Sequence, residues 1–100
     1  MRVLVVEDDP SQRRLLELVV RGRGHEPVLC ATLAEARSAP PCDLALVDRR
    51  LPDGDGLELA RQLSVPVYLL TGEEGGALGG IPHLTKPVRA ADFDRILPID

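Results

Sequence analysis

Three carboxylates stand directly after apolar segments of this sequence, in positions where they could share one site. Glu7 and Asp8 follow the apolar run of residues 3–6, and Asp48 follows the run of residues 44–47. Carboxylates that lie close together repel one another unless a proton or a cation neutralises them. A hard cation such as Mg²⁺ relieves that repulsion because it takes oxygen ligands. These residues are therefore a candidate Mg²⁺ site, if the fold brings them together.

A hydroxyl and an ammonium follow two later apolar segments in the same way. Thr71 comes directly after residues 66–70, and Lys86 follows residues 84–85. A carboxylate can attack phosphorus and form an acyl phosphate. The ammonium of Lys86 would neutralise charge on the phosphoryl oxygens, and the hydroxyl of Thr71 would donate a hydrogen bond to one of them. The set predicts phosphoryl transfer to Asp48.

Apolar runs alternate with helical patterns along the chain, which predicts an α/β fold with a parallel sheet covered by helices on both faces. Strands are expected at residues 3–6, 27–31, 44–47, 66–70 and 84–85, and helices at 10–22, 33–39, 57–63 and 90–97. Right-handed crossovers then determine most of the topology. In such a sheet ligands bind outside the carboxyl ends of the strands, and the polar residues described above all lie there.

Two helix starts have clear local signals. Asp9 is expected to be an N-cap with Pro10 in the first helical position. Thr32 and Glu35 have the spacing of a capping box, in which each side chain accepts from a free amide of the first turn.

Length, charge and cysteine content narrow the class of protein. A chain of 100 residues is expected to form a single domain, 1–100. A net charge of −4 argues against a nucleic-acid surface, which needs a basic stripe. The first apolar run is too short for a signal peptide or a membrane span, and the two cysteines lack metal or disulfide spacing. We expect a soluble cytoplasmic protein with no direct nucleic-acid or membrane contact.

Four motifs together resemble the receiver domain of bacterial two-component response regulators. They are VVEDDP (5–10), LVDRRLPDGDG (46–56), LTG (70–72) and TKP (85–87), in the order of that family and across nearly the whole chain. The resemblance implies a flavodoxin-like doubly wound fold, with a five-stranded parallel sheet in the strand order 2-1-3-4-5.

The resemblance also implies roles for the acidic residues. Glu7, Asp8 and Asp48 would bind Mg²⁺ or Mn²⁺ together with the backbone carbonyl of Arg50. Asp48 would accept the phosphoryl group from a phosphohistidine on a sensor histidine kinase or a histidine phosphotransfer protein. Such a domain is not an enzyme in the ordinary sense, since it catalyses at most its own phosphorylation and dephosphorylation.

The resemblance implies that three further positions contact the phosphoryl group or respond to it. Thr71 and Lys86 would contact it, with Thr71 acting as a switch residue. Receivers usually have an aromatic residue three positions before the lysine, and this chain has His83 there. His83 is therefore the second candidate switch residue.

The chain departs from the family pattern after Thr71. The segment 72–80 is rich in glycine, and each interior glycine costs a helix roughly 1 kcal/mol relative to alanine. We therefore expect the family's fourth helix to be missing or reduced and the fifth to be shortened. Most receivers use this face for dimers and output, so a poorly covered sheet here would mark a homodimer or partner contact.

Other functions and simpler interpretations remain open. A pseudo-receiver would be an interaction module that works without phosphorylation. An aspartyl-phosphate phosphatase would need a second Asp where Arg50 stands, and no phosphate-binding loop follows the first strand. Asp53 and Asp55 are interpreted as turn formers, and His25 as a solvated residue. Four arginines are expected on a solvated helix face, with contact to a kinase as the alternative: Arg13, Arg14, Arg21 and Arg23.

Overall fold

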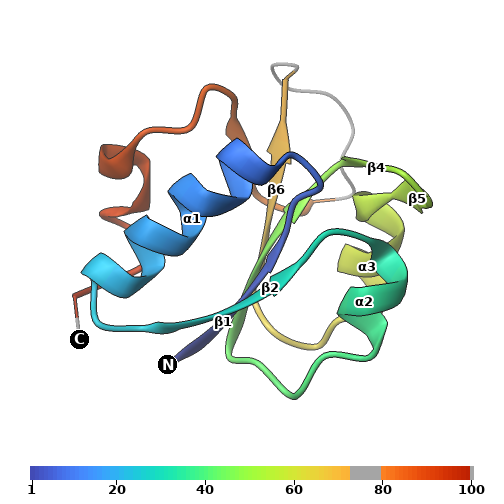
Figure 1. The fold of residues 1–100 in the computed structure, drawn as a ribbon, viewed down its shortest axis with the longest axis horizontal. Helices are drawn as coiled ribbons and strands as arrows, with labels where there is room; N and C mark the ends of the chain where they lie inside the picture. The colour runs from blue at the N-terminus through green and yellow to red at the C-terminus, as the bar shows by residue number, and fades with distance from the viewer. Residues whose placement is uncertain (73–79, 100) are drawn as a thin grey trace.

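A parallel sheet forms the centre of the computed structural model, which describes residues 1–72 and 80–99 (Figure 1). Its five strands lie in the order β2-β1-β3-β6-β7. The bounds are β1 Arg2–Val6, β2 Glu26–Cys30, β3 Leu44–Asp48, β6 Val67–Thr71 and β7 His83–Thr85. All neighbouring pairs run parallel, and counting only these strands gives the order 2-1-3-4-5. The predicted flavodoxin-like topology is confirmed.

Helices cover both faces of the sheet (Figure 1). The helices are α1 Pro10–Gly22, α2 Leu33–Arg37 and α3 Gly56–Gln62, followed near the C-terminus by the 3₁₀ turn η1 Ala90–Phe93. α1 and the C-terminal segment pack on one face, whereas α2 and α3 pack on the other. The fold is therefore doubly wound, as predicted.

Strand β1 shows why a continuous apolar run forms a central strand. Val3 and Val5 face the core on the α1 side, and Leu4 and Val6 face the core on the side of α2 and α3. All four are at most 3% exposed. Burying one such side chain stabilises the fold by about 1.5–3 kcal/mol, so polar residues are excluded from both faces of the strand.

The predicted helix starts are confirmed. Asp9 is the N-cap of α1, and its carboxylate accepts from the backbone N–H of Gln12 at 3.2 Å. The hydroxyl of Thr32 accepts from the N–H of Glu35 at 3.1 Å. The carboxylate of Glu35 accepts in turn from the N–H of Ala31, at 3.3 Å, one residue earlier than in a regular capping box.

The C-terminal helix expected over 90–97 is wrong in extent, because only η1 forms and turns follow it. Phe93 and Leu97 are nevertheless buried in the core. Arg23, expected on a solvated face, has a side chain only 15% exposed and donates to the carbonyls of Ala90 and Leu97. These bonds give the segment polar partners without a regular helix. The shortened fifth helix of the prediction is confirmed.

The segment 50–55, in which Asp53 and Asp55 were interpreted as turn formers, contains a small antiparallel hairpin. β4 Arg50–Leu51 pairs with β5 Gly54–Asp55. Leu51 anchors the hairpin in the core beside α2 and α3. The sequence concealed the pairing because each strand has only two residues and Pro52 and Gly54 dominate the pattern.

His25 was predicted to be solvated, and this is wrong. The side chain is buried between the two ends of the chain. Its Nδ1 lies 2.9 Å from the terminal ammonium of Met1, and its Nε2 bonds the carbonyl of Pro98. The turn before β2 packs against the C-terminal segment. The spacing of residues along the sequence does not reveal this contact.

The expected loss of the fourth helix concerns residues 73–79, which lie outside the described residues, as does most of the segment proposed to mark a partner contact. On either side of it, Gly72 is in a bend and Gly80 in a turn with φ of 81°. Across residues 1–72 and 80–99, no helix has the length and apolar character needed to cross a membrane.

Candidate functional site

The sheet brings the predicted polar residues to one rim. Glu7 directly follows β1, Asp48 ends β3 and Thr71 ends β6. Two backbone hydrogen bonds continue the sheet pairing past the strand ends. The N–H of Glu7 donates to the carbonyl of Cys30 at 2.9 Å, and the N–H of Lys86 donates to the carbonyl of Thr71 at 2.7 Å. The backbone of the site is therefore held by the sheet itself.

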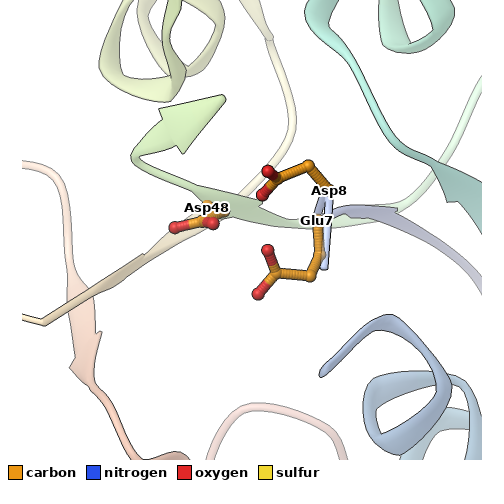
Figure 2. Close-up of side chains that lie close together, drawn as sticks. All are labelled: Glu7, Asp8 and Asp48. Carbon is orange, nitrogen blue, oxygen red and sulfur yellow. The ribbon is translucent and has the colours of Figure 1, made fainter. Parts of the chain in front are cut away.

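The three carboxylates form one cluster (Figure 2). The side chains of Glu7 and Asp8 extend toward Asp48, and one oxygen of each of the three residues lies within 4.8 Å of the others. Glu7 and Asp48 are buried, whereas Asp8 is exposed. In the part of the chain that the structure describes, no other group of three His, Cys, Asp or Glu side chains is close enough to hold a metal ion.

This donor set fits a hard divalent cation. All the ligand atoms are carboxylate oxygens, which Mg²⁺ and Mn²⁺ prefer over nitrogen or sulfur. One side of the cluster faces solvent through Asp8, so water ligands and a phosphoryl oxygen can complete the coordination. The acidic cluster predicted from the sequence is present.

Lys86 supplies a positive charge inside the cluster. Its Nζ lies 3.0 Å from Oε1 of Glu7 and 3.2 Å from Oδ2 of Asp48. The side chain of Lys86 is 28% exposed, so it remains accessible from the rim. The ammonium neutralises part of the negative charge of the two buried carboxylates.

The cluster shifts the pKa values of two of its members. Burial raises the pKa of Glu7 well above its ordinary value, and the hydrogen bond and charge of Asp48 add to this while Lys86 opposes it. Burial acts to lower the pKa of Lys86, but its bond to Glu7 and the charge of Asp48 outweigh burial and raise it. Lys86 therefore stays an ammonium, as a phosphate-binding role requires.

A hollow of about 360 Å³ opens beside Asp48. Its described lining includes Arg50, Thr71 and Lys86 together with Asp48. Four residues predicted to act on the phosphoryl group or the cation thus surround one space. Arg49, which the sequence reasoning did not single out, also lines it, and its Nε lies 3.4 Å from the carboxylate of Asp55.

Gly56 closes the loop against the end of β3. A Cβ at this position would lie 2.0 Å from the carbonyl oxygen of Asp48, so only glycine allows the approach. Its N–H donates to the carbonyl of Arg49 at 2.8 Å. The aspartate–glycine pair before a helix was the sequence signal for this contact, but the sequence reasoning took it for turn chemistry alone.

His83 lies half-buried on β7, opposite Leu69 of β6. The described residues that line the hollow do not include it. Its role as a switch residue stays a prediction.

The chain is similar to known regulatory proteins in sequence and to receiver domains in structure. No protein-family model matches the chain. It is 43% identical to the transcriptional regulatory protein AruR of Pseudomonas aeruginosa, over 92% of this chain and 46% of AruR. It is 36% identical to the virulence transcriptional regulatory protein PhoP of Salmonella typhimurium, over 87% of this chain and 46% of PhoP. A CheY-like receiver domain protein from Methanospirillum hungatei has a TM-score of 0.82 and 26% identity, with 94% of this chain and 87% of that chain covered.

The chain belongs to the receiver-domain family of two-component response regulators. It therefore has the function of a phosphoacceptor receiver domain, in a shortened form. Receiver domains are not classical enzymes. The chain spans less than half the length of AruR and PhoP, and so corresponds to one part of those proteins.

Proposed function

We propose that Asp48 is the residue that this receiver domain phosphorylates. The observation that carries the proposal is the position of its carboxylate, which is buried at the end of β3, lies 3.2 Å from the Lys86 ammonium and belongs to a residue that lines the hollow. A carboxylate oxygen of Asp48 attacks the phosphorus of a phosphohistidine, the new O–P bond forms, and the N–P bond breaks with its electron pair left on the imidazole.

Each neighbouring side chain has a distinct task in this proposal. Lys86 neutralises charge on the phosphoryl oxygens, and the hydroxyl of Thr71 donates a hydrogen bond to one of them. Glu7, Asp8 and Asp48, with the backbone carbonyl of Arg50, would hold Mg²⁺ or Mn²⁺. When bound, the cation supplies positive charge to the phosphoryl oxygens and offsets the carboxylate repulsion.

A histidine kinase, or a histidine phosphotransfer protein, is the partner that fits this chemistry, since AruR and PhoP are regulators of the response-regulator class. We propose that residues 1–100 act as a single receiver domain in the cytoplasm, where such kinases present their phosphohistidine. The homodimer considered from the sequence rested on a segment mostly outside the described residues. It stays a prediction that size-exclusion chromatography would check.

The test is phosphorylation by a small phosphodonor such as phosphoramidate, read by intact mass. Wild-type protein with Mg²⁺ should gain one phosphoryl group, and Asp48→Asn should gain none. Asp9→Asn is the matched control, because it makes the same chemical change at the α1 cap, outside the carboxylate cluster. It should gain the group as the wild type does.

Two results would contradict the proposal. A mass gain retained in Asp48→Asn would assign phosphorylation to another residue. A wild type that binds Mg²⁺ without any gain, from phosphoramidate or from a phosphorylated kinase, would favour the pseudo-receiver alternative instead.

A further inference from the structure

Asp53 connects the loop after the phosphoacceptor to the start of α2, whose bonded residues precede it by 20 and 19 positions in the sequence. Its Oδ1 accepts from the backbone N–H of Leu33 at 2.9 Å, and its Oδ2 accepts from the N–H of Ala34 at 3.1 Å. Both amides belong to the first turn of α2. The sequence suggested a turn former here, so this use of both carboxylate oxygens is a structural finding.

Helix α2 depends on these two bonds. It has only five residues, and isolated helices of that length do not hold together in water. The first amides of any helix lack partners within the helix. In α2 the hydroxyl of Thr32 satisfies the N–H of Glu35, and Asp53 satisfies the two amides before it.

The other end of this connection is the phosphoacceptor loop. Asp53 lies at the tip of the β4–β5 hairpin, which leaves β3 at Arg49 and returns at Gly56. The N–H of Arg49 donates to Leu70 on β6 at 3.0 Å, so the base of the hairpin is attached to the sheet. Arg50, whose carbonyl is the proposed metal ligand, lies between this base and the tip.

The hairpin tip also packs closely on α2. A Cβ at Gly54 would lie 2.8 Å from Cδ1 of Leu33, a side chain that is only 1% exposed. Gly54 has a φ of +149°, which further restricts the position to glycine. The tip is therefore held by hydrogen bonds and by shape, and cannot shift without disturbing the start of α2.

We propose that Asp53 is a positioning residue that couples divalent-cation binding at the acidic cluster to the order of the first turn of α2. The proposal rests on the proposed function, because the coupling runs through the loop that carries the Arg50 carbonyl. Coupling of this kind is reciprocal: if an ordered α2 favours the bound cation, the bound cation orders α2 to the same degree. Asp53 itself touches neither the cation nor the phosphoryl group.

Titration of Mg²⁺ by calorimetry tests the first half of this coupling. We expect Asp53→Ala to bind Mg²⁺ about threefold to tenfold more weakly than the wild type. A tenfold loss of affinity corresponds to roughly 1.4 kcal/mol. Asp53→Asn keeps one carbonyl oxygen as an acceptor and should lose less. Thr32→Ala removes one cap bond of the same turn but leaves both bonds to Asp53, so its loss of affinity should be smaller than that of Asp53→Ala.

Hydrogen exchange tests the second half without use of activity. Mg²⁺ should slow exchange of the Leu33 and Ala34 amides in the wild type and should leave them unchanged in Asp53→Ala. Wild-type affinity in Asp53→Ala, or an equal loss in Thr32→Ala, would overturn the inference alone. A wild type that binds no Mg²⁺ would overturn the proposed metal site as well, which separates the two failures.

Discussion

The ammonium of Lys86 lies 3.0 Å from a carboxylate oxygen of Glu7, across 79 positions of the sequence. Glu7 is 1% exposed and the side chain of Lys86 is 28% exposed, so the carboxylate of this pair is buried while the ammonium stays in reach of solvent. The pair joins the end of the first strand of the sheet to the residue after the last. Lys86 is also the only lysine in the chain, which makes the contact accessible to chemistry that is selective for amines.

We predict that Glu7→Gln makes Lys86 more reactive. The bond to Glu7 helps to raise the pKa of Lys86, so loss of the bond should lower that pKa. The fraction of free amine at about pH 8.5 should then increase by about threefold or more, because a shift of one pKa unit changes this fraction about tenfold. The measurement is the rate of acetylation of Lys86 by peptide mass mapping, with the terminal amine as an internal reference. Glu17→Gln is the matched control, because Glu17 pairs with Arg14 and Arg21 instead. Equal rates in all three proteins would contradict the prediction.

Replacement of Gly56 by alanine should destabilise the fold. The added Cβ would lie 2.0 Å from the Asp48 carbonyl oxygen and 2.8 Å from Cγ1 of Val47, so backbone must move. We expect a loss of about 1–3 kcal/mol in the free energy of unfolding, measured by urea denaturation. Gly22→Ala is the control, because nothing lies within 4 Å of its Cβ position on α1, and alanine there should be neutral or stabilising by up to about 1 kcal/mol. Similar losses in both variants would count against the close approach at Gly56.

The contribution of Asp53 to stability should depend on pH. Hydrogen bonds from the Leu33 and Ala34 amides hold the pKa of Asp53 below its ordinary value of 3.8. A carboxylate with a lowered folded-state pKa stabilises the fold above the unfolded pKa, and this contribution disappears as pH falls through the folded value. The difference in melting temperature between the wild type and Asp53→Asn should therefore be largest near neutral pH, where the carboxylate is charged. It should shrink below pH 3.8. A difference that is constant with pH would show that the carboxylate charge has no part in the cap.

Arg23→Ala should loosen the C-terminal segment. The guanidinium donates to the carbonyls of Ala90 and Leu97 at 2.9 and 3.2 Å, and to the carboxylate of Asp94 at 2.7 Å. Loss of the two carbonyl bonds should cost about 1–2 kcal/mol, with faster hydrogen exchange over 90–97. Asp94→Asn removes only the exposed ion pair and should change stability by less than about 1 kcal/mol. If Asp94→Asn costs as much as Arg23→Ala, the carbonyl contacts contribute nothing.

The alternation of strands and helices and the acidic cluster were predictable because both follow from local patterns, whereas the strand order followed from the family resemblance. Glu7, Asp48 and Thr71 each end or follow an apolar strand, and parallel strands place their carboxyl ends at one rim. Asp9 and Thr32 predicted helix starts because capping depends on neighbours three residues away. Lys86 was expected at the same rim because it follows the last strand, but only the family motif distinguishes it from an ordinary surface lysine.

The features that sequence reasoning missed depend on long-range contacts. His25 is buried and Arg23 is half-buried because the C-terminal segment passes over them, and the residues next to them in the sequence do not indicate that contact. Asp53 forms a turn, as predicted, but its partners on α2 are brought near by packing on the same face of the sheet. Spacing along the chain carries information about neighbours within one element, and these contacts join different elements.

The buried imidazole of His25 has a practical consequence for fusion proteins. By bonding the amine of Met1 and the carbonyl of Pro98, it places both ends of the described chain at the edge of the sheet where β1 begins (Figure 1). The acidic cluster lies at the opposite edge, where β1 and β3 end. A fluorescent protein or an affinity tag joined at either end would therefore leave the path of an approaching phosphohistidine open.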